Sequence, residues 1–291
     1  MTSKGPVAAL ATPVGPFGSA HAESDQQQAS REFAERLGAK RRKAGAPVRT
    51  AFVIAEEDRE RPPMAELLSS ATGGGGGRGG QLRLKLYLSL LWVCAKEPYE
   101  AIRPARAWAA LLGLDDIENR GARRIHSAIH DLVDRDLARV RDRGGQASAV
   151  RPLSDRGNAR KYEPPSETYN RFKQKGAGER ALQPHRYFRL PSGLWTAGHI
   201  AALSGPALAM LLVVRCEQRG NENTPVWFSP KVATERYGLA ESTRVQGLQQ
   251  LRDRGLLTTE TRSVSESGAF IDQIRRRNVH TLNLTELVAK A

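Results

Sequence analysis

Basic and hydrogen-bonding side chains recur at helical spacing in the segment 119–136, whose sequence is NRGARRIHSAIHDLVDRD. Its apolar residues share one side of a helical wheel: Ile125, Ile129, Leu132 and Val133. The opposite side carries side chains that can donate hydrogen bonds: Arg120, Arg123, Arg124, Ser127 and His130. Arginine near the start of a helix can bond guanine or phosphate oxygens, so this face suits a polyanionic partner.

The helical segment 241–253 divides in the same way but carries less charge. On a helical wheel its buried side consists of Val245, Leu248 and Leu251. The exposed side carries uncharged polar residues: Ser242, Thr243, Gln246, Gln249 and Gln250. Arg244 lies at the flank, where it suits a phosphate. Glutamine can pair with adenine and serine or threonine can bond several base edges, so this face suits base recognition. The alternative is a face that only contacts water.

Further basic residues follow both segments, where polar loops or wings are expected. They are Arg151, Arg156, Arg160 and Lys161 after the first segment, and Arg275, Arg276 and Arg277 after the second. The run KRRK at 40–43 suits phosphates and solvent equally. The formal net charge of +14 favours nucleic acid first and an anionic membrane second. The alternative is a basic protein without such a partner.

No set of residues typical of catalysis is found in the sequence. His126 and His130 are four residues apart, but Ser127 stands where zinc-binding HExxH motifs have Glu, and no third ligand is evident. The glycine run 73–80 lacks the Lys-Ser/Thr ending of a phosphate-binding loop and is interpreted as a linker. No pair of carboxylates is placed as acid and base. We expect no enzyme, no metal and no cofactor.

Apolar periodicity and turn residues predict the elements that position these faces. Helices are expected at 31–43, 62–68, 82–96, 105–112, 119–136, 195–202, 206–219, 230–237 and 241–253. Strands are expected at 48–54, near 140, and at 186–190, 226–228, 256–264 and 276–284. Residues 1–30 lack any period and are expected to be disordered, and residues 146–165 to form a long wing or loop. No apolar stretch approaches the length of a membrane span.

The two halves of the chain repeat one order of elements: strand, short helix, long apolar helix, short helix, turn, amphipathic helix and strand. The residues LVDRDL at 132–137 align with LRDRGL at 251–256. Cys94 and Cys216 fall at matching points of the two long helices, and we expect both to be buried, reduced thiols. The repeated order predicts two copies of one architecture.

The stretch 229–257 carries a recurring pattern of glycine, leucine and hydroxyl residues: Gly238-Leu239, Ser242-Thr243, Leu248, Leu251 and Gly255-Leu256. In this order the residues resemble the helix-turn-helix core of winged-helix regulators. Gly238 permits a tight turn, and Gly255 lets the chain leave the helix with a positive φ. The chain departs from the pattern at Ala240, where a small polar cap is usual, so Glu241 or Ser242 must cap the helix.

The resemblance extends over residues 229–282 if the two strands after 256 form the wing. It implies an α+β fold, mainly α, with two tandem winged helix-turn-helix domains. We expect a disordered basic tail at 1–46, a first domain at 47–165 that includes the glycine-rich loop 73–80, a linker at 166–184 and a second domain at 185–291. The stretches RGGQLRLKLYLSLLW and PVWFSPKVATERYGL also resemble tandem winged-helix proteins of GC-rich bacteria, a likeness that brings no activity with it.

The resemblance implies sequence-specific binding of double-stranded DNA, with the second helix of each unit in the major groove and the wing on the backbone or minor groove. A transcription regulator is the favoured role. A plasmid or phage replication initiator and a winged-helix scaffold that binds proteins are the alternatives. We expect a cytoplasmic, nucleoid-associated protein without membrane contact. A homodimer is compatible with this reading but not required, because two units in one chain can cover two half-sites.

Overall fold

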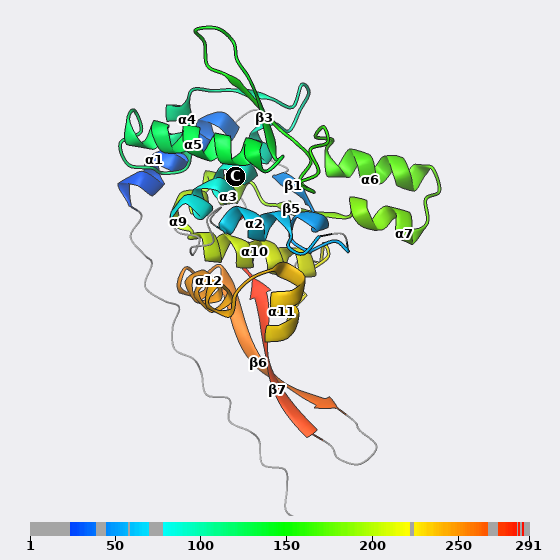
Figure 1. Cartoon of the computed structure of the whole chain (residues 1–291). Helices are drawn as coiled ribbons and strands as arrows, with labels where there is room; N and C mark the ends of the chain where they lie inside the picture. Colours follow the sequence, from blue (N-terminus) through cyan, green and yellow to red (C-terminus); the bar gives the residue numbers. More distant parts are fainter. Residues whose placement is uncertain are drawn as a thin grey trace, which may run out of the picture.

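The computed structural model of the chain describes residues 24–38, 45–57, 59–69, 78–221, 224–266, 273–283, 285 and 287. The predictions for residues 1–23, for the basic run 40–43 and for glycines 73–77 lie outside these residues. Within them the fold is mixed α+β, with about half of the residues in helices (Figure 1). The predicted fold class is thereby confirmed at the level of α+β. Among the helices described, none combines the length and apolarity that a membrane span requires.

The first part of the chain contains five helices and four short strands among the residues described. They are α1 Asp25–Gly38, β1 Ala46–Arg49, a 3-10 turn Thr50–Phe52, α2 Pro63–Leu68, α3 Arg78–Val93, β2 Ala101–Ile102, α4 Ala105–Leu111, α5 Arg120–Asp134, β3 Ala138–Arg141 and β4 Ala149–Pro152. The strands β2, β4 and β3 form an antiparallel sheet in that order. The apolar helix α3 is buried almost throughout, as its all-round apolar sequence predicts.

The second part continues with seven helices and three strands in the described residues. They are α6 Pro165–Gln174, α7 Glu179–Leu182, a 3-10 turn Gln183–His185, β5 Tyr187–Leu190, α8 Gly193–Thr196, α9 His199–Ala202, α10 Gly205–Glu217, α11 Pro230–Tyr237, α12 Glu241–Asp253, β6 Leu257–Glu266 and β7 Gln273–Leu282. The predicted bounds of α11 and α12 are confirmed at every residue. The expected strand 226–228 is reduced to one bridge, between Val226 and His280 of β7.

Two segments contain a repeated order of elements. The first unit (residues 78–152) runs α3, β2, α4, α5, β3 and β4, and the second unit (residues 205–282) runs α10, Val226, α11, α12, β6 and β7. In both, the extended residue or strand after the first helix pairs with the last strand of the hairpin. Figure 1 shows the two hairpins at opposite ends of the molecule.

Several predicted elements were wrong. Residues 25–30 belong to helix α1 and not to a disordered tail. The predicted strand 48–54 ends at Arg49 and continues as a 3-10 turn, which buries Ala51 and Phe52 as well as a strand would. The expected helix 195–202 breaks into α8 and α9 at Gly198, whose φ is +72°. Short apolar runs do not distinguish a strand from a buried turn, which explains the second error.

The glycine run and the predicted linker also contain helix. Gly79 and Gly80 lie in the first turn of α3, where a Cβ on Gly80 would stand 2.4 Å from the carbonyl oxygen of Leu68. Glycine at this position lets α3 approach the end of α2. Residues 166–184 form most of α6 and all of α7, and α6 begins with Pro165, which suits the first position of a helix.

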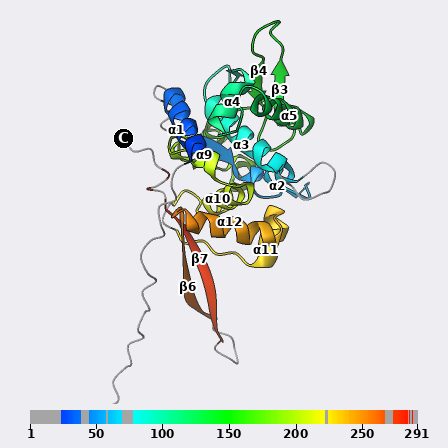
Figure 2. The same ribbon diagram turned by 90° about the vertical axis from the view of Figure 1, so that its left-hand side faces the viewer.

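One apolar core joins the two units. Strand β1 pairs with β5 in antiparallel register, from Ala46 opposite Leu190 to Arg49 opposite Tyr187. Trp92 of α3 stacks on Trp195 of α8 with ring centroids 4.8 Å apart, and α3 also packs against α10. Helix α1 covers α4, α8 and α9 (Figure 2). Contacts therefore join residues on both sides of the predicted linker, and the domain boundaries stay a prediction.

Candidate nucleic-acid interface

Helix α5 is positioned by its apolar side and by a cap at its start. Ile125, Ala128, Ile129 and Leu132 are buried, and the helix packs against α3 and α4. The carboxylate of Asp116 accepts the backbone N–H of Arg120 at 3.2 Å, and this bond, with others from Asn119, holds the pKa of Asp116 below its usual value. A charged acceptor at this end satisfies N–H groups that the helix leaves free.

The polar face of α5 lies where the sequence predicts it. All five predicted side chains are exposed: Arg120, Arg123, Arg124, Ser127 and His130. His126 is exposed as well. Val133, predicted on the buried side, is 36% exposed and lies on the side of the helix that exposes His126 and His130. The face can donate hydrogen bonds and carries several positive charges.

Helix α12 is rotated relative to the helical-wheel prediction. Arg244 is 8% exposed and its guanidinium pairs with Glu241 at 3.3 Å, whereas Val245 is 53% exposed. The predicted position of Arg244 at an exposed flank, where it would suit a phosphate, and the predicted burial of Val245 were therefore wrong. Gly247 provides the reason, because it lies against α10, where a Cβ would stand 2.3 Å from the carbonyl oxygen of Pro206. This close approach centres the buried side of α12 on position 247.

The exposed stripe of α12 runs along Ser242, Val245, Gln246 and Gln249, at positions i, i+3, i+4 and i+7. Gln249 bonds within the helix, donating to Asp253 at 2.6 Å and accepting from Arg252 at 2.5 Å. Thr243 is only partly exposed.

Gln250 does not belong to this stripe, although the sequence assigns it there. Its Oε1 accepts the backbone N–H of Ser204 at 2.9 Å, at the start of α10. The start of α12 has no side-chain cap at Ala240, in line with the departure from the helix-turn-helix pattern. Gln250 therefore joins α12 to α10 and faces the protein.

The two helices bury equivalent positions, separated by 119 residues along the chain. The matching buried pairs are Ile125 with Arg244, Ala128 with Gly247, Ile129 with Leu248, and Leu132 with Leu251. The exits also match: Leu137 N–H donates to the Leu132 carbonyl and Leu256 N–H to the Leu251 carbonyl, both at 2.9 Å. The residues that precede Leu137 and Leu256 both have positive φ: +55° at Asp136 and +67° at Gly255.

The turns that precede these helices match as well. Gly113 follows α4 with a φ of +64°, and Gly238 follows α11 with a φ of +61°. Glycine adopts this left-handed conformation without the penalty that a Cβ brings. The expected roles of Gly238 and Gly255 in the backbone are thereby confirmed.

The first hairpin turns at residues 142–148, upstream of the predicted basic residues. Arg151 lies in β4 and pairs with Glu100 at 3.3 Å. Arg156 lies beyond the strand and its guanidinium bonds both carboxylate oxygens of Glu56, at 2.9 and 2.8 Å. Arg160 and Lys161 are exposed in the same loop. These four residues therefore do not share the tip of one wing.

Sequence reasoning missed three arginines that do belong to this hairpin. Arg139 and Arg141 are exposed in β3, with Arg139 opposite Arg151 and Arg141 bonded to Glu100 at 2.9 Å. Arg143 lies in the turn, directly after Asp142. The signal was an arginine at every second residue from 139 to 143, which in a strand places the side chains on one face.

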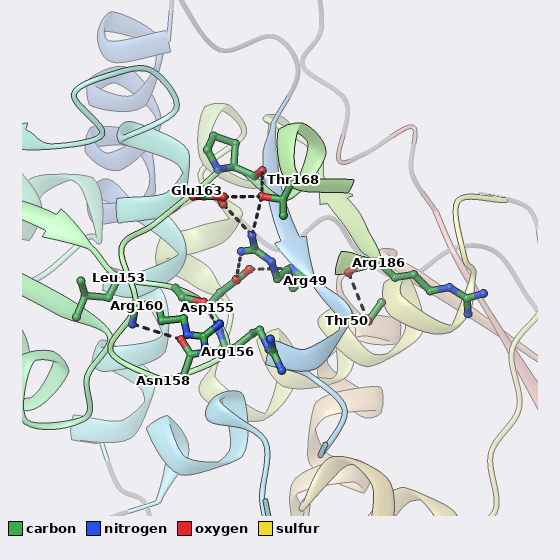
Figure 3. A network of polar contacts seen from close by, with 12 residues as sticks. Arg49, Thr50, Leu153, Asp155, Arg156, Asn158, Arg160, Glu163, Thr168 and Arg186 are labelled. Atoms are coloured by element: carbon green, nitrogen blue, oxygen red, sulfur yellow. Dashed lines mark hydrogen bonds and ion pairs between the residues drawn. The ribbon is translucent and has the colours of Figure 1, made fainter. Parts of the chain in front are cut away.

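The loop behind the first hairpin is held by a buried ionic network (Figure 3). The guanidinium of Arg49 pairs with Asp155 at 2.5 Å, and its Nη2 also donates to the carbonyl of Glu163 at 2.9 Å. The backbone N–H of Arg49 donates to the other Asp155 oxygen at 2.7 Å. Both side chains are almost fully buried, so the network fastens the loop to β1 and α6. Arg156, through its bonds to Glu56, fastens the same loop nearer the surface.

The second hairpin pairs over its full length, with ten residues in each strand. Arg276 is exposed, and Arg277 lies over the ring of Trp227 at 4.0 Å from the centroid. The side chain of Arg275 lies outside the described residues. At the base of the hairpin, burial lowers the pKa of His280 to about 4, so its ring is neutral at pH 7.

A buried lysine connects the first unit to α9. Lys85 of α3 donates to the carbonyl of Ala201 at 2.6 Å. Burial, followed by the positive charges of Arg254 and Arg124, lowers the pKa of Lys85 to about 7. Arg124 belongs to α5 and Arg254 follows α12.

The described residues contain no group of three or more His, Cys, Asp or Glu side chains placed to hold a metal ion. Cys94 and Cys216 are buried thiols that belong to no disulfide, as predicted. Comparison of the chain with family profiles, with curated proteins and with solved structures found no match.

Proposed function

We propose that the chain is a sequence-specific double-stranded DNA-binding protein with two tandem winged helix-turn-helix units. The observation that carries the proposal is the shared burial register of α5 and α12. The two helices bury equivalent positions, and each follows a glycine turn, precedes a hairpin and exposes a polar face. The formal net charge of +14 favours a polyanion as the partner of those faces.

In this proposal α5 and α12 enter the major groove of one duplex and the hairpins contact the backbone or minor groove. The arginines of α5 supply most of the attraction to phosphates, and the uncharged face of α12 supplies more of the base discrimination. Arg139, Arg141 and Arg276 add charge on the hairpins. We assign no DNA contact to Arg244, which is buried, or to Arg156, whose guanidinium bonds both oxygens of Glu56 away from the hairpin.

Transcription regulation is the role that we favour, because it is the commonest use of this fold. Replication initiation at repeated origin sites is the second candidate, favoured by two units in one chain. Sequencing the DNA that immunoprecipitates with the protein separates the two roles. Scattered promoter sites indicate a regulator, and one cluster of repeats beside its own gene indicates an initiator.

Replacing Arg123 and Arg124 together by alanine is expected to weaken duplex binding and to flatten its salt dependence. Each lost phosphate contact reduces the slope of log affinity against log salt by about 0.9, so the double variant should lose about 2. Fluorescence anisotropy titrations at several salt concentrations measure affinity and slope together.

The matched control is the double variant Lys173→Ala with Arg180→Ala, which removes two exposed positive charges from α6 and α7. Figure 1 shows these helices set apart from α5 and α12. The control should keep the wild-type slope. Equal slopes for all three proteins would remove α5 from the interface. Absence of duplex binding at low salt would refute DNA binding and leave the protein-binding scaffold.

A further inference from the structure

Val245 is an apolar side chain without an apolar environment. It is 53% exposed, more than any other large hydrophobic residue in the described part of the chain. It stands in the middle of α12, and not at a helix end or in a loop where an exposed valine is common. The rotation of α12 about its axis that exposes Val245 also buries the neighbouring Arg244. The exposure of Val245 therefore follows from the packing of the whole helix.

The neighbours of Val245 on the helix surface are polar. Ser242 lies three residues before it, Gln246 follows it and Gln249 lies four residues after it, all exposed. The side chain of Gln246 takes part in no hydrogen bond among the residues described, so its amide has both a donor and an acceptor to offer. One isopropyl group flanked by amides is too small an apolar patch for a protein interface.

The major-groove edge of an A·T pair has the same composition as this surface. Adenine offers N7 as an acceptor and N6–H as a donor, which a glutamine amide can bond together, and thymine offers a C5 methyl group beside them. No other base carries an apolar group in the major groove. An apolar side chain next to a glutamine is therefore complementary to an A·T pair and has no matching group on a G·C pair.

We infer that Val245 contacts the methyl group of a thymine, with Gln246 bonding an adenine, so that α12 selects A·T pairs in its half-site. The inference rests on the proposed function and specifies which base pairs the second unit reads. At the equivalent position α5 exposes His126, with Arg123 and Ser127 at its sides. Because α5 presents His126 and not an apolar side chain at this position, the expected selection of A·T pairs applies to the second unit.

The test removes methyl groups from one partner at a time, either from the thymine base or from the side chain of Val245. The full chain first selects duplexes from a random pool, and each thymine of the selected site is then replaced singly by deoxyuridine, which lacks the C5 methyl. One replacement is expected to weaken wild-type binding about fourfold, the loss for leaving one buried methyl group unpaired. Val245→Ala should weaken binding to the thymine duplex to a similar extent and should lose nothing further on the deoxyuridine duplex.

Val232→Ala is the matched control, because Val232 is 42% exposed but lies on α11, outside the stripe. Val232→Ala should lose as much affinity as the wild type when the thymine is replaced by deoxyuridine. Thermal unfolding should give the same melting temperature for both variants and the wild type, since neither side chain is buried. The inference is overturned if every thymine can be replaced by deoxyuridine without loss of affinity, or if Val245→Ala still loses affinity on that replacement. In either case selected duplexes still support DNA binding, whereas a pool that yields no duplex refutes the proposed function as well.

Discussion

Lys85 carries an ionisable group in a place where charge is costly. It has one hydrogen-bond acceptor, the Ala201 carbonyl, and the charges of Arg254 and Arg124 lower its pKa further after burial. The pKa of about 7 lies below the ordinary value of 10.5, so the unfolded chain binds the proton more tightly than the folded one. The folded state therefore loses stability as pH falls from about 10.5 to about 7.

Lys85→Met is expected to stabilise the protein at pH 7, by about 2 kcal/mol, because it removes a buried charge and keeps the apolar stem. The gain should shrink as pH rises from 7 toward 10, where the wild-type lysine is neutral. Urea unfolding across this pH range measures the difference, with the exposed Lys96→Met as a control that should show no such trend. A difference that stays constant with pH would contradict the role assigned to the charge.

At the scale of single residues, the sequence predicts exposure where the hydrophobic pattern is unambiguous. All five polar residues assigned to the outer face of α5 are exposed. The prediction of exposure fails for Arg244, Val245 and Gln250, because the buried side of α12 is determined by the point at which α10 contacts it. That approach is set by Gly247, and a glycine contributes no hydrophobicity to the wheel.

At the scale of elements, the fit between α10 and α12 determines which residues α12 exposes. A Cβ on Gly247 would lie 2.3 Å from the Pro206 carbonyl oxygen and 2.7 Å from Cγ of Met210. A contact as short as 2.3 Å with backbone cannot be relieved by a side-chain rotation. One of the two helices has to move.

Gly247→Ala is therefore expected to lower stability by about 2 kcal/mol, the usual scale of overpacking, and to weaken duplex binding. Chemical denaturation and anisotropy titrations measure the two effects. Gly178→Ala is the control, because a Cβ there meets no atom within 4 Å and the backbone has no positive φ. Unchanged stability in Gly247→Ala would show that α12 does not depend on this contact.

The bounds of helices are predictable where the sequence contains start and stop residues. α11 and α12 were predicted at every residue because Pro230, Gly238 and Gly255 mark their ends. The segment 166–184 was expected to be a linker because it is polar, yet Pro165 and Glu167 form an ordinary helix start. Polarity alone does not separate an exposed helix from a loop.

At the scale of the whole molecule, β1 and β5 join the two units and the Arg49–Asp155 pair fastens this junction. The pairing of β1 with β5 could not be predicted from sequence, because 138 residues separate even its nearest partners, Arg49 and Tyr187, and no local pattern specifies the partner. The same holds for the single core that runs through both units.

Asp155→Ala is expected to lower the free energy of unfolding by about 3 to 5 kcal/mol, because it leaves the buried Arg49 without a counter-charge. Since both units share one core, calorimetry should show a single transition that moves to lower temperature as a whole. Glu118→Ala, which breaks the exposed pair with Arg106, is the control and should change little. Two transitions, of which only one shifts, would show that the units fold independently.

The hairpins at opposite ends of the molecule, together with the shared core, have a consequence for the length of any target. Modules connected by a slack tether accept half-sites at many separations, since the tether takes up the difference. Here packed side chains connect α5 to α12 through α3 and α10, so the proposed DNA binding implies one fixed separation between the two half-sites. Its target would be defined as much by the number of base pairs between two half-sites as by the bases within them.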